Sequence, residues 1–430
     1  MTQAGTISSP NRLDLDSAPA TDVLGAAAHS RGEADLAAAL TRPTGPAGIE
    51  VSVVMPCLNE AETLETCIRK ATQCLERNGV RGEVIVADNG STDGSIEIAR
   101  RAGARVVHVA EKGYGMALMK GFEAAHGKYL IMGDADDSYD FENLMPFIER
   151  MRAGDDVVMG NRFRGGIQPG AMPWHHRYIG NPVLTGVLNL FFRSGIGDAH
   201  CGLRGLTRRA FQTMRLRTSG MEFASEMVVK AVMCGLRMSE VSTTLKPDGR
   251  SRPPHLRSFR DGWRHLRFMM LLAPDWLLMF PGLVMATLGA TLFAVLWQRP
   301  VSIGRATLDI HSIMLGALLV TVGYQGLTMG FAARIYAVQH GIGRASRALQ
   351  FGFRLLNLER GLLAGGGVLA AGVVLIGLVV GLWAAGSFGP LDTGYTLRPL
   401  TAGMTLVTLG VQTILMSFFY SMLGLCGRQS

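Results

Sequence analysis

The chain has 430 residues, enough for two or three domains, and 48% of them are hydrophobic against 18% charged. Its formal net charge is +8, and no nucleic-acid partner is expected. The six cysteines form neither a CxxC pair nor the spacing of a disulfide framework, so a disulfide-stabilised scaffold is excluded and reduced packing cysteines are expected.

Residues 1–48 are rich in alanine, glycine, serine, threonine and proline and show no sustained hydrophobic period. This composition predicts a disordered N-terminal tail. No basic segment followed by an apolar stretch stands near the N-terminus, so we expect no secretory signal and a cytoplasmic first half of the chain.

Between residues 49 and 136, short β-branched runs alternate with segments whose apolar residues recur at helical spacing. Strands are predicted at 51–56, 83–88, 104–110 and 128–136, and helices at 59–79, 96–103 and 116–127. This alternation predicts an α/β domain with a mostly parallel, doubly wound sheet. Residues 155–245 are mixed, with a strand predicted at 156–163 and a helix at 225–235.

Polar clusters stand at the ends of three predicted strands: Asn59-Glu60, Asp88-Asn89 and Asp134–Asp136. In doubly wound sheets, ligands bind at the carboxyl ends of the strands. We therefore expect the three clusters to meet in one crevice.

The third cluster, Asp134-Ala135-Asp136, is a DxD motif. Two carboxylates with one residue between them can both reach Mg²⁺ or Mn²⁺, which prefers oxygen ligands and often binds one or two carboxylates together with substrate phosphates. For such a cluster taken alone, a solvated acidic turn is the alternative. Asp137 and Asp140, which follow the motif, are expected to be solvated or capping residues.

Residues 251–274 place arginine and histidine among leucine, phenylalanine, tryptophan and methionine. This pattern predicts a juxtamembrane helix that lies in the membrane interface, with its guanidinium groups among anionic headgroups. An ordinary cytoplasmic linker is the alternative.

Four windows without a charged residue follow, each long enough for the ~20 apolar residues that a bilayer requires. They are 276–297, 312–333, 361–391 and 399–427. We predict a domain of four transmembrane helices at 275–427, because in a soluble protein these helices would be apolar on every face. Gly377 and Gly381 form a GxxxG pair in the third window, which suits close helix packing and leaves a homo-oligomer open.

The arginines near these windows predict the orientation of the chain in the membrane. They concentrate before the first window and between the second and third. Under the positive-inside rule, both chain ends and the middle loop face the cytoplasm. We therefore predict an integral protein of the cell (inner) membrane with a cytoplasmic soluble domain.

The motifs VSVVMPCLNEAETL, VIVADNGSTDGS, KGYGMA and IMGDADDSY, in this order and at these intervals, resemble the opening of family 2 glycosyltransferases. With GNRF, DAHCGLRGLTRRAF and the membrane windows, the chain resembles polyprenyl-phosphate glycosyltransferases, the relatives of dolichol-phosphate mannose and glucose synthases. The resemblance implies a GT-A nucleotide-sugar domain at 49–250. It also implies inverting, metal-dependent transfer of one sugar, from UDP-glucose or a similar donor or from GDP-mannose, to undecaprenyl or dolichyl phosphate at the cytoplasmic membrane face.

The same resemblance implies a set of donor-binding positions at the strand ends and in the loop after the third strand. They are Pro56, Leu58, Asn59, Glu60, Asp88, Lys112, Gly113 and Asp134. The first four line the base and ribose, Asp88 hydrogen-bonds the base, and Lys112-Gly113 lies near the phosphates. Where the family often has a second aspartate this chain has Asn89, which leaves that base contact open.

For the metal, the resemblance implies Asp134 and Asp136, with Asp136 as the direct ligand and a candidate catalytic residue. Mg²⁺ or Mn²⁺ would neutralise the charge of the diphosphate leaving group. Family members often carry a glutamine where this chain has Ser138, so the third ligand stays open.

Asp198 matches an acidic residue that is often proposed as catalytic. A phosphate monoester has a second pKa near 6 and scarcely needs a general base, so Asp198 is either a base or a residue that orients the acceptor, Arg204 or a sugar hydroxyl. Arg162 and Arg204 are candidates for the acceptor phosphate, because guanidinium is a planar fork matched to phosphate oxygens; a surface salt bridge is the alternative for either. Arg250 and Arg252 could serve the same end.

Two other functions stay open from the sequence. The domain could glycosylate another membrane lipid, such as a diacylglycerol or hopanoid. The chain could also be a non-catalytic module that binds nucleotide sugar and translocates lipid. His175, His176 and His200 lack the spacing of a zinc site and are expected to be ordinary polar residues.

Overall fold

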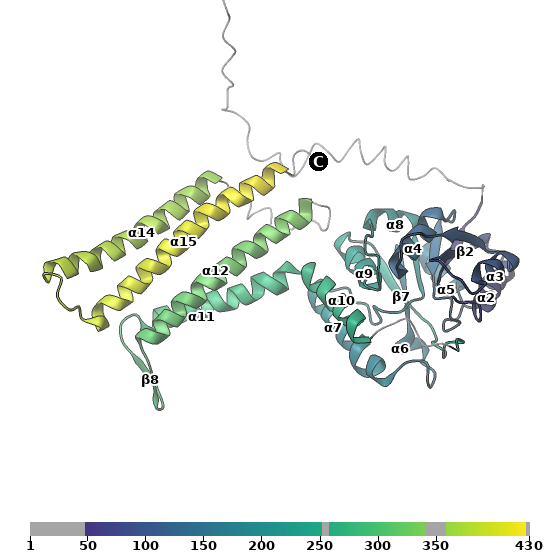
Figure 1. The fold of residues 1–430 in the computed structure, drawn as a ribbon, viewed down its shortest axis with the longest axis horizontal. Helices are drawn as coiled ribbons and strands as arrows, with labels where there is room; N and C mark the ends of the chain where they lie inside the picture. The colour runs from purple at the N-terminus through teal and green to yellow at the C-terminus, as the bar shows by residue number, and fades with distance from the viewer. Residues whose placement is uncertain (1–47, 252–257, 340–357, 427–430) are drawn as a thin grey trace, which may run out of the picture. The chain divides into compact units, whose positions relative to one another are not determined.

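The computed structural model describes residues 48–251, 258–339 and 358–426 (Figure 1). The predicted disordered tail lies almost wholly outside the described residues, and Arg252 lies outside them too. Residues 51–242 build one sheet with helices on both faces, and the long apolar helices come after residue 275.

A seven-stranded sheet with the order β3-β2-β1-β4-β6-β5-β7 forms the centre of the soluble part. The strands are β1 (Val51–Cys57), β2 (Gly82–Asp88), β3 (Arg105–His108), β4 (Tyr129–Met132), β5 (Val157–Asn161), β6 (Arg204–Thr207) and β7 (Met238–Ser242). Each strand predicted from the sequence is present, with ends shifted by a few residues.

The strands that carry the predicted polar clusters are parallel. β1 is parallel to β2 and to β4, and β2 is parallel to β3. β6 is antiparallel to both of its neighbours, β4 and β5. The prediction of a mostly parallel sheet is confirmed, and β6 is the exception because the simple strand–helix alternation ends at β5.

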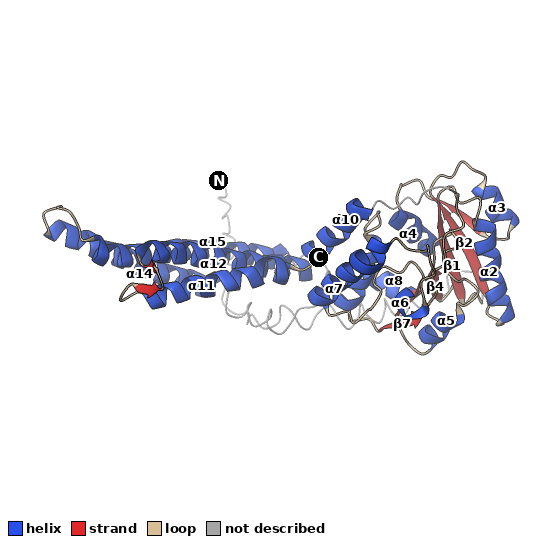
Figure 2. Cartoon of the chain, turned by 90° about the horizontal axis from the view of Figure 1, so that it is seen from below, coloured by secondary structure: helices blue, strands red, loops and turns tan. Residues whose placement is uncertain are grey.

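Helices cover both faces of the sheet. One layer consists of α2 (Leu64–Arg77), α3 (Ser95–Arg101) and α5 (Met145–Arg152), and the other of α4 (Tyr114–Ala124), α8 (Arg208–Met214) and α9 (Phe223–Met233). Figure 2 shows the strands of the sheet between α2 and α4. The sheet is therefore buried on both faces, which is typical of parallel sheets.

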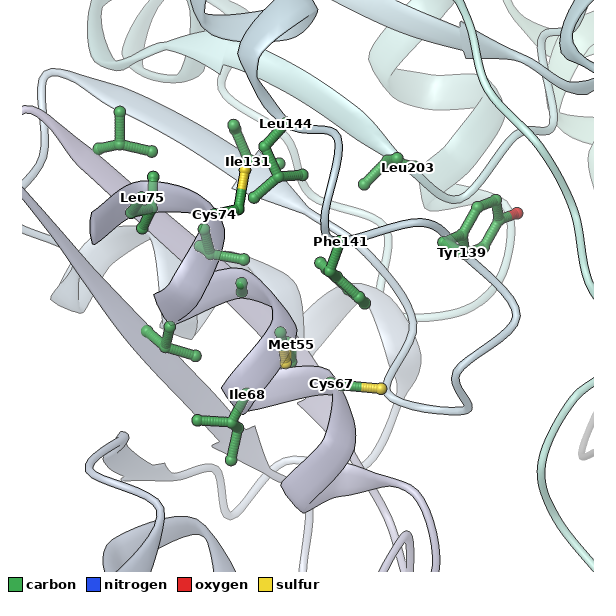
Figure 3. Close-up of a cluster of buried hydrophobic side chains, with 14 of the residues drawn as sticks. Met55, Cys67, Ile68, Cys74, Leu75, Ile131, Tyr139, Phe141, Leu144 and Leu203 are labelled. Carbon is green, nitrogen blue, oxygen red and sulfur yellow. The ribbon is translucent and has the colours of Figure 1, made fainter. Parts of the chain in front are cut away.

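The spacing of apolar residues in α2 shows how this core forms. Figure 3 shows Cys67, Ile68 and Leu75 of α2 in one cluster with Met55 of β1 and Ile131 of β4. The buried positions of α2 recur every three or four residues and so lie on one face of the helix. They are Leu64, Cys67, Ile68, Ala71, Cys74 and Leu75.

The cysteines agree with the prediction of reduced packing residues. Five are free, and four of these are buried. The five are Cys57, Cys67, Cys74, Cys201 and Cys234, the last of them partly buried. The side chain of Cys426 lies outside the described residues.

The long connection between β5 and β6 and the segment after β7 add further helices. They are α6 (Arg162–Gly165), η1 (His176–Gly180), α7 (Asn181–Phe192) and α10 (Ser258–Leu271), and α10 packs on α7 and α9. α10 buries Asp261 and His265, whereas Phe259 and Trp263 are 93% and 56% exposed. α10 also buries Met269. Its outward aromatic residues suit a membrane interface, and the interfacial position of this helix stays a prediction.

Among the described residues, four helices are long and apolar enough to cross a membrane, by length and composition. They are η2 (Asp275–Met279) continued by α11 (Phe280–Leu296), then α12 (Ile310–Gln339), α14 (Leu358–Ala385) and α15 (Thr393–Cys426). A short hairpin of β8 (Val301–Ile303) and β9 (Ala306–Leu308) joins α11 to α12. All four predicted windows therefore fall on helices.

Glycines bring these helices into close contact, in two side-by-side pairs, α11 with α12 and α14 with α15 (Figure 1). A Cβ atom added at Gly289 would lie 2.5 Å from the carbonyl oxygen of Gly316, and one at Gly323 would lie 2.4 Å from the backbone nitrogen of Ala286. Small residues at such crossings let helix backbones approach closely. The GxxxG pair predicted for this role, Gly377 and Gly381, has no atom within 4 Å of an added Cβ.

Replacing Gly323 by leucine is expected to lower the stability of the α11–α12 pair by about 1–3 kcal/mol, because the side chain would overpack a backbone contact. Thermal unfolding of the detergent-solubilised chain measures the effect. Gly377→Leu is the matched control, since it adds the same side chain to an open helix face. Equal melting of the two variants would show that the Gly323 contact does not hold the pair together.

Candidate active site

The three predicted polar clusters lie at neighbouring strand ends. β1 lies between β2 and β4 in the sheet. The hydroxyl of Thr63, in the loop after β1, donates to the carbonyl oxygen of Ala135 at 2.6 Å and so joins that loop to the DxD segment. The clusters thus lie at neighbouring strand ends, but Asn59-Glu60 and Asp134–Asp136 line two different cavities and Asp88-Asn89 lines neither of them, so one shared crevice stays a prediction.

The loops after β1 and β2 are held together by side-chain hydrogen bonds. Asp88 is 2% exposed and accepts the backbone N–H groups of Gly90 and Ser91 at 3.0 and 3.1 Å. Asn59 has a positive φ of 59°, which asparagine tolerates better than most residues, and its Oδ1 accepts the N–H of Thr92 at 2.7 Å. These bonds fix the shape of the predicted donor-binding edge.

A cavity of about 260 Å³ lies at this edge. Its lining residues are Asn59, Glu60, Glu62, Thr92, Asp93 and Arg250. Pro56 and Leu58, two other predicted donor contacts, are partly exposed nearby in β1 and in the loop that follows it. The cavity therefore contains Asn59 and Glu60 of the predicted set, together with Arg250 from far along the chain.

Asn89 positions the predicted Lys112-Gly113 segment. Its Nδ2 donates to the carbonyl oxygens of Val109 and Glu111, and its Oδ1 accepts the N–H of Gly113 at 2.7 Å. Lys112 Nζ in turn donates to the carbonyl oxygen of Asn89 at 2.6 Å. An aspartate at position 89 could not donate these two hydrogen bonds to Val109 and Glu111, which explains the asparagine at this position.

Gly113 is needed for its backbone conformation and its close contacts. Its φ is 138°, a region that residues with a side chain rarely adopt. A Cβ atom here would lie 2.2 Å from the carbonyl oxygen of Ser219. The glycine thus allows the 109–113 loop to pack closely against the segment before α9 at the point where α4 begins.

The two DxD carboxylates have different partners. Asp134 accepts the hydroxyl of Tyr114 at 2.9 Å. Asp136 accepts the backbone N–H and hydroxyl of Ser138 on Oδ1, and Nη2 of Arg250 at 2.9 Å on Oδ2. Burial, followed by the neighbouring charge of Asp136, raises the pKa of Asp134 to about 6.

The other two acidic residues of this stretch point to separate partners. Asp137 forms an ion pair with Lys70 at 2.5 Å. Asp140 accepts the backbone N–H of Glu142 at 3.2 Å. Asp140 thus caps a local turn as predicted, whereas Asp137 is neither solvated nor a cap but an ion-pair partner of α2; that only Asp134 and Asp136 bind the metal stays a prediction.

The chemistry of these ligands fits a divalent ion that also binds substrate. In the described part of the chain, no group of three His, Cys, Asp or Glu residues is placed to hold a metal alone. Asp134 and Asp136 offer two carboxylates, and burial, followed by the neighbouring charge of Asp136, raises the pKa of Asp134, so a cation here would favour its charged form. Mg²⁺ or Mn²⁺ would fit here with substrate phosphate oxygens as further ligands.

Asp198 is paired with Arg162 in the protein interior. The side chains are 0% and 8% exposed. Nε and Nη2 of Arg162 donate to the two carboxylate oxygens at 2.7 and 2.8 Å, and the backbone N–H of Arg162 donates at 3.0 Å. Bidentate pairs of this kind fix orientation as well as charge, so the geometry favours an orienting role for Asp198 over that of a base.

Arg204 is fully buried and bound to the backbone. Its guanidinium donates to the carbonyl oxygens of Cys201, Ala224 and Ala199 at 2.7, 2.7 and 3.0 Å. It also lines the larger cavity described next, so a phosphate contact stays a prediction. These hydrogen bonds of Arg204 join the turn after Asp198 to the start of α9.

A second cavity, of about 420 Å³, connects the carboxylate pair with these arginines. Its walls include Asp134, Asp136, Arg162, Arg204 and Arg250. Further lining residues come from η1, α7 and α10 and include His176, Asn181, Leu184, Ser258, Asp261 and His265. The juxtamembrane helix α10 is therefore part of the cavity wall.

Two histidines in this wall were not recognised from the sequence as part of a site. The rings of His200 and His265 lie 4.8 Å apart, edge to face. His265 Nδ1 lies 2.8 Å from the hydroxyl of Ser225, and His200 Nε2 is buried without a hydrogen-bond partner in the described part of the chain. Burial lowers the pKa of His265 to about 4 and that of His200 well below its usual value, so both imidazoles are neutral near pH 7. The four-residue spacing of Asp261 and His265 on α10 was the available signal for His265.

Both the soluble part and the membrane part of the chain are similar to known protein families. The family "Glycosyl transferase family 2" matches residues 52–215, and "Glycosyltransferase family 2 C-terminal transmembrane region" matches residues 331–424. The chain is 39% identical over 376 residues to the low-salt glycan biosynthesis hexosyltransferase Agl6 of Haloferax volcanii, covering 87% of this chain and 89% of that protein.

Other similarities cover the soluble part. The dolichyl-phosphate hexose transferase of Haloferax volcanii is 28% identical over 192 residues, which are 45% of this chain and 81% of that protein. Glucosyl-3-phosphoglycerate synthase from Mycobacterium tuberculosis, solved with Mn²⁺, uridine diphosphate and phosphoglyceric acid, is 22% identical with a TM-score of 0.39, covering 52% of this chain and 77% of that one. The match to Agl6 over most of both chains and the two family matches show that this chain belongs to glycosyltransferase family 2, with a GT-A-type domain and a C-terminal membrane region.

Proposed function

We propose that the enzyme transfers one hexose, with inversion, from a nucleotide sugar to a polyprenyl phosphate at the cytoplasmic face of the cell (inner) membrane, with Mg²⁺ or Mn²⁺. The observation that carries the proposal is the larger cavity. It joins the carboxylates Asp134 and Asp136 to Arg162 and to α10, the helix that precedes the membrane helices. The relatives named as a hexosyltransferase and a dolichyl-phosphate hexose transferase support a hexose and a lipid phosphate.

The donor would bind across the two cavities. Asn59, Glu60 and Asp88 lie at the edge proposed for the base and ribose, while Asp134 and Asp136 face the site proposed for the diphosphate. A divalent ion bound by these carboxylates would neutralise the diphosphate as it leaves. Lys112 is exposed next to the same edge and offers a further positive charge.

Transfer needs no proton to be removed from the acceptor. A phosphate monoester has a second pKa near 6 and is largely a dianion at neutral pH. One of its oxygens forms the new bond to the anomeric carbon as the bond from that carbon to the diphosphate breaks, and the electron pair leaves with the diphosphate. In this scheme Asp198 holds Arg162 in place, and Arg162 directs the acceptor phosphate.

The exposed side chains of α10 support an acceptor that resides in the membrane. Phe259 and Trp263 project outward beside Arg260 and Arg264, whose side chains are 52% and 41% exposed. Aromatic residues next to guanidinium groups suit a membrane interface with anionic headgroups. A tethered domain would meet a lipid phosphate that is concentrated in two dimensions.

Purified protein in lipid nanodiscs tests the proposal. UDP-glucose, UDP-N-acetylglucosamine and GDP-mannose, each labelled in the sugar, are offered with undecaprenyl or dolichyl phosphate and with Mg²⁺ or Mn²⁺. Metal-dependent label in the lipid phosphate is expected for one donor. Diacylglycerol and a hopanoid serve as alternative acceptors; label in these, or in no lipid under any condition, would refute the proposed acceptor.

A further inference from the structure

Arg250 stands where the two cavities meet. Among the described residues, it is the one that lines both the 260 Å³ cavity at the donor edge and the 420 Å³ cavity with the carboxylate pair. Its side chain is only 12% exposed. It comes from the segment after β7, 114 positions beyond Asp136, and no strand-end motif contains it.

The guanidinium of Arg250 binds three carboxylates at once. Nη1 lies 3.2 Å from Glu60 Oε1, and Nη2 lies 2.9 Å from both Asp136 Oδ2 and Asp248 Oδ2. With Ser138 on Oδ1, both oxygens of Asp136 accept hydrogen bonds. The proposed metal ligand is thus already paired with a cation from the protein itself.

A guanidinium and a divalent ion compete for this carboxylate oxygen. A magnesium–oxygen bond is about 2.0–2.1 Å long, and two positive groups on one oxygen would repel each other strongly in a partly buried site. Binding of the metal to Asp136 is therefore expected to weaken or displace the hydrogen bond from Nη2 of Arg250. The guanidinium would keep Glu60 and Asp248 as partners, and the N–H that had bound Asp136 would become available to another acceptor.

The donor diphosphate is the anion within reach, because a metal held by both carboxylates and phosphates keeps the phosphates next to Asp136. We propose, on the basis of the proposed function, that Arg250 is a built-in cation that the metal replaces, and that its guanidinium then binds the donor diphosphate. The planar fork of arginine suits phosphate oxygens as well as carboxylates. Binding of the metal and binding of the nucleotide are therefore expected to strengthen each other.

The backbone around Arg250 is anchored so that a side-chain rotation is sufficient for this exchange. Gly249 N–H donates to the carbonyl oxygen of Asp136 at 2.9 Å, and Lys246 N–H to that of Ser138 at 2.9 Å. Ser251 N–H donates to the carboxylate of Glu62 at 2.7 Å. These bonds hold the segment across the ends of β1 and β4 whichever anion the guanidinium binds.

Mn²⁺ binding to the full-length protein in nanodiscs, measured by calorimetry with and without UDP, tests the inference without any sugar transfer. For the wild type, UDP is expected to strengthen Mn²⁺ binding by about 5- to 150-fold, the usual range of coupling between two sites. Arg250→Gln is expected to bind Mn²⁺ alone more tightly than the wild type does, and to lose most of the strengthening by UDP.

Two further variants serve as controls. Lys70→Gln removes the same charge from a pair with Asp137, next to the site but off its carboxylates, and is expected to behave as the wild type. Arg250→Lys keeps the charge and is expected to bind Mn²⁺ alone about as weakly as the wild type. The inference is overturned if Arg250→Gln matches the wild type in both measurements, or if Arg250→Lys binds Mn²⁺ alone as tightly as Arg250→Gln.

Failure of this inference can be told apart from failure of the proposed function. Wild-type protein that binds Mn²⁺ and UDP cooperatively but transfers no sugar to polyprenyl phosphate would refute the function and leave the role of Arg250 standing. Protein that transfers sugar normally while Mn²⁺ binding is indifferent to Arg250→Gln would refute the inference alone.

Discussion

Replacing Asp136 by asparagine is expected to lower kcat/KM for sugar transfer by about 100- to 1,000-fold, the range seen when one preorganised electrostatic contact to a transition state is removed. The amide keeps the shape of the side chain and can still accept the hydrogen bonds of Ser138. It lacks the negative charge that would hold a divalent ion against the leaving diphosphate. Initial rates of labelled-lipid formation at saturating Mn²⁺ measure the loss.

Asp137→Asn is the control for this experiment. It makes the same chemical change one position along the chain, at a residue whose carboxylate pairs with Lys70. A partly exposed ion pair is worth at most about 1 kcal/mol, so this variant should stay within about fivefold of the wild type. If Asp136→Asn lost Mn²⁺ binding but kept the wild-type rate, the metal-dependent mechanism would be wrong and the carboxylate would serve binding only.

The parts of the site that lie at strand ends were predictable from the sequence. The alternation of strands and helices before residue 136 placed Asn59, Asp88 and Asp134 at the ends of the first, second and fourth strands. Parallel pairing of these strands then brings their ends to one edge. This inference uses only local periodicity and the geometry of parallel sheets, which is why it agrees with the structure.

The cavity-lining residues that come from later in the chain, such as Arg250 and His265, were not predictable in the same way. Arg250 reaches Glu60 across 190 positions of sequence, and His265 reaches Ser225 across 40. No local pattern fixes such distances, because they depend on the antiparallel entry of β6 and on the docking of α10 against α7 and α9. A buried histidine on an amphipathic helix and a lone arginine in a loop have many ordinary explanations until their partners are known.

Asp198 shows how a pairing partner changes the interpretation of a residue. The sequence left it open between a base and an orienting residue. Both of its carboxylate oxygens accept hydrogen bonds from Arg162 inside the protein. Since removing one member of a buried pair leaves the other charge uncompensated, each single substitution should cost about 3–5 kcal/mol of unfolding free energy.

A double-mutant cycle of Arg162→Met, Asp198→Asn and the two combined is expected to show this coupling. The asparagine can still accept the backbone N–H of Arg162, and the methionine fills much of the arginine's volume without its charge. The combined variant should therefore lose less unfolding free energy than the sum of the two single variants. Chemical unfolding of the detergent-solubilised chain measures all three.

The kinetics of the same variants decide what the pair does for the reaction. If Asp198 positions Arg162 for the acceptor phosphate, Arg162→Met and Asp198→Asn both raise KM for polyprenyl phosphate, and the combined variant stays impaired although its stability recovers. If Asp198 is instead a general base, Asp198→Asn lowers kcat at unchanged KM and removes the acid limb of the pH–rate profile. We expect the first pattern, because a dianionic phosphate has no proton to give up and a carboxylate held by three N–H groups is poorly placed to take one.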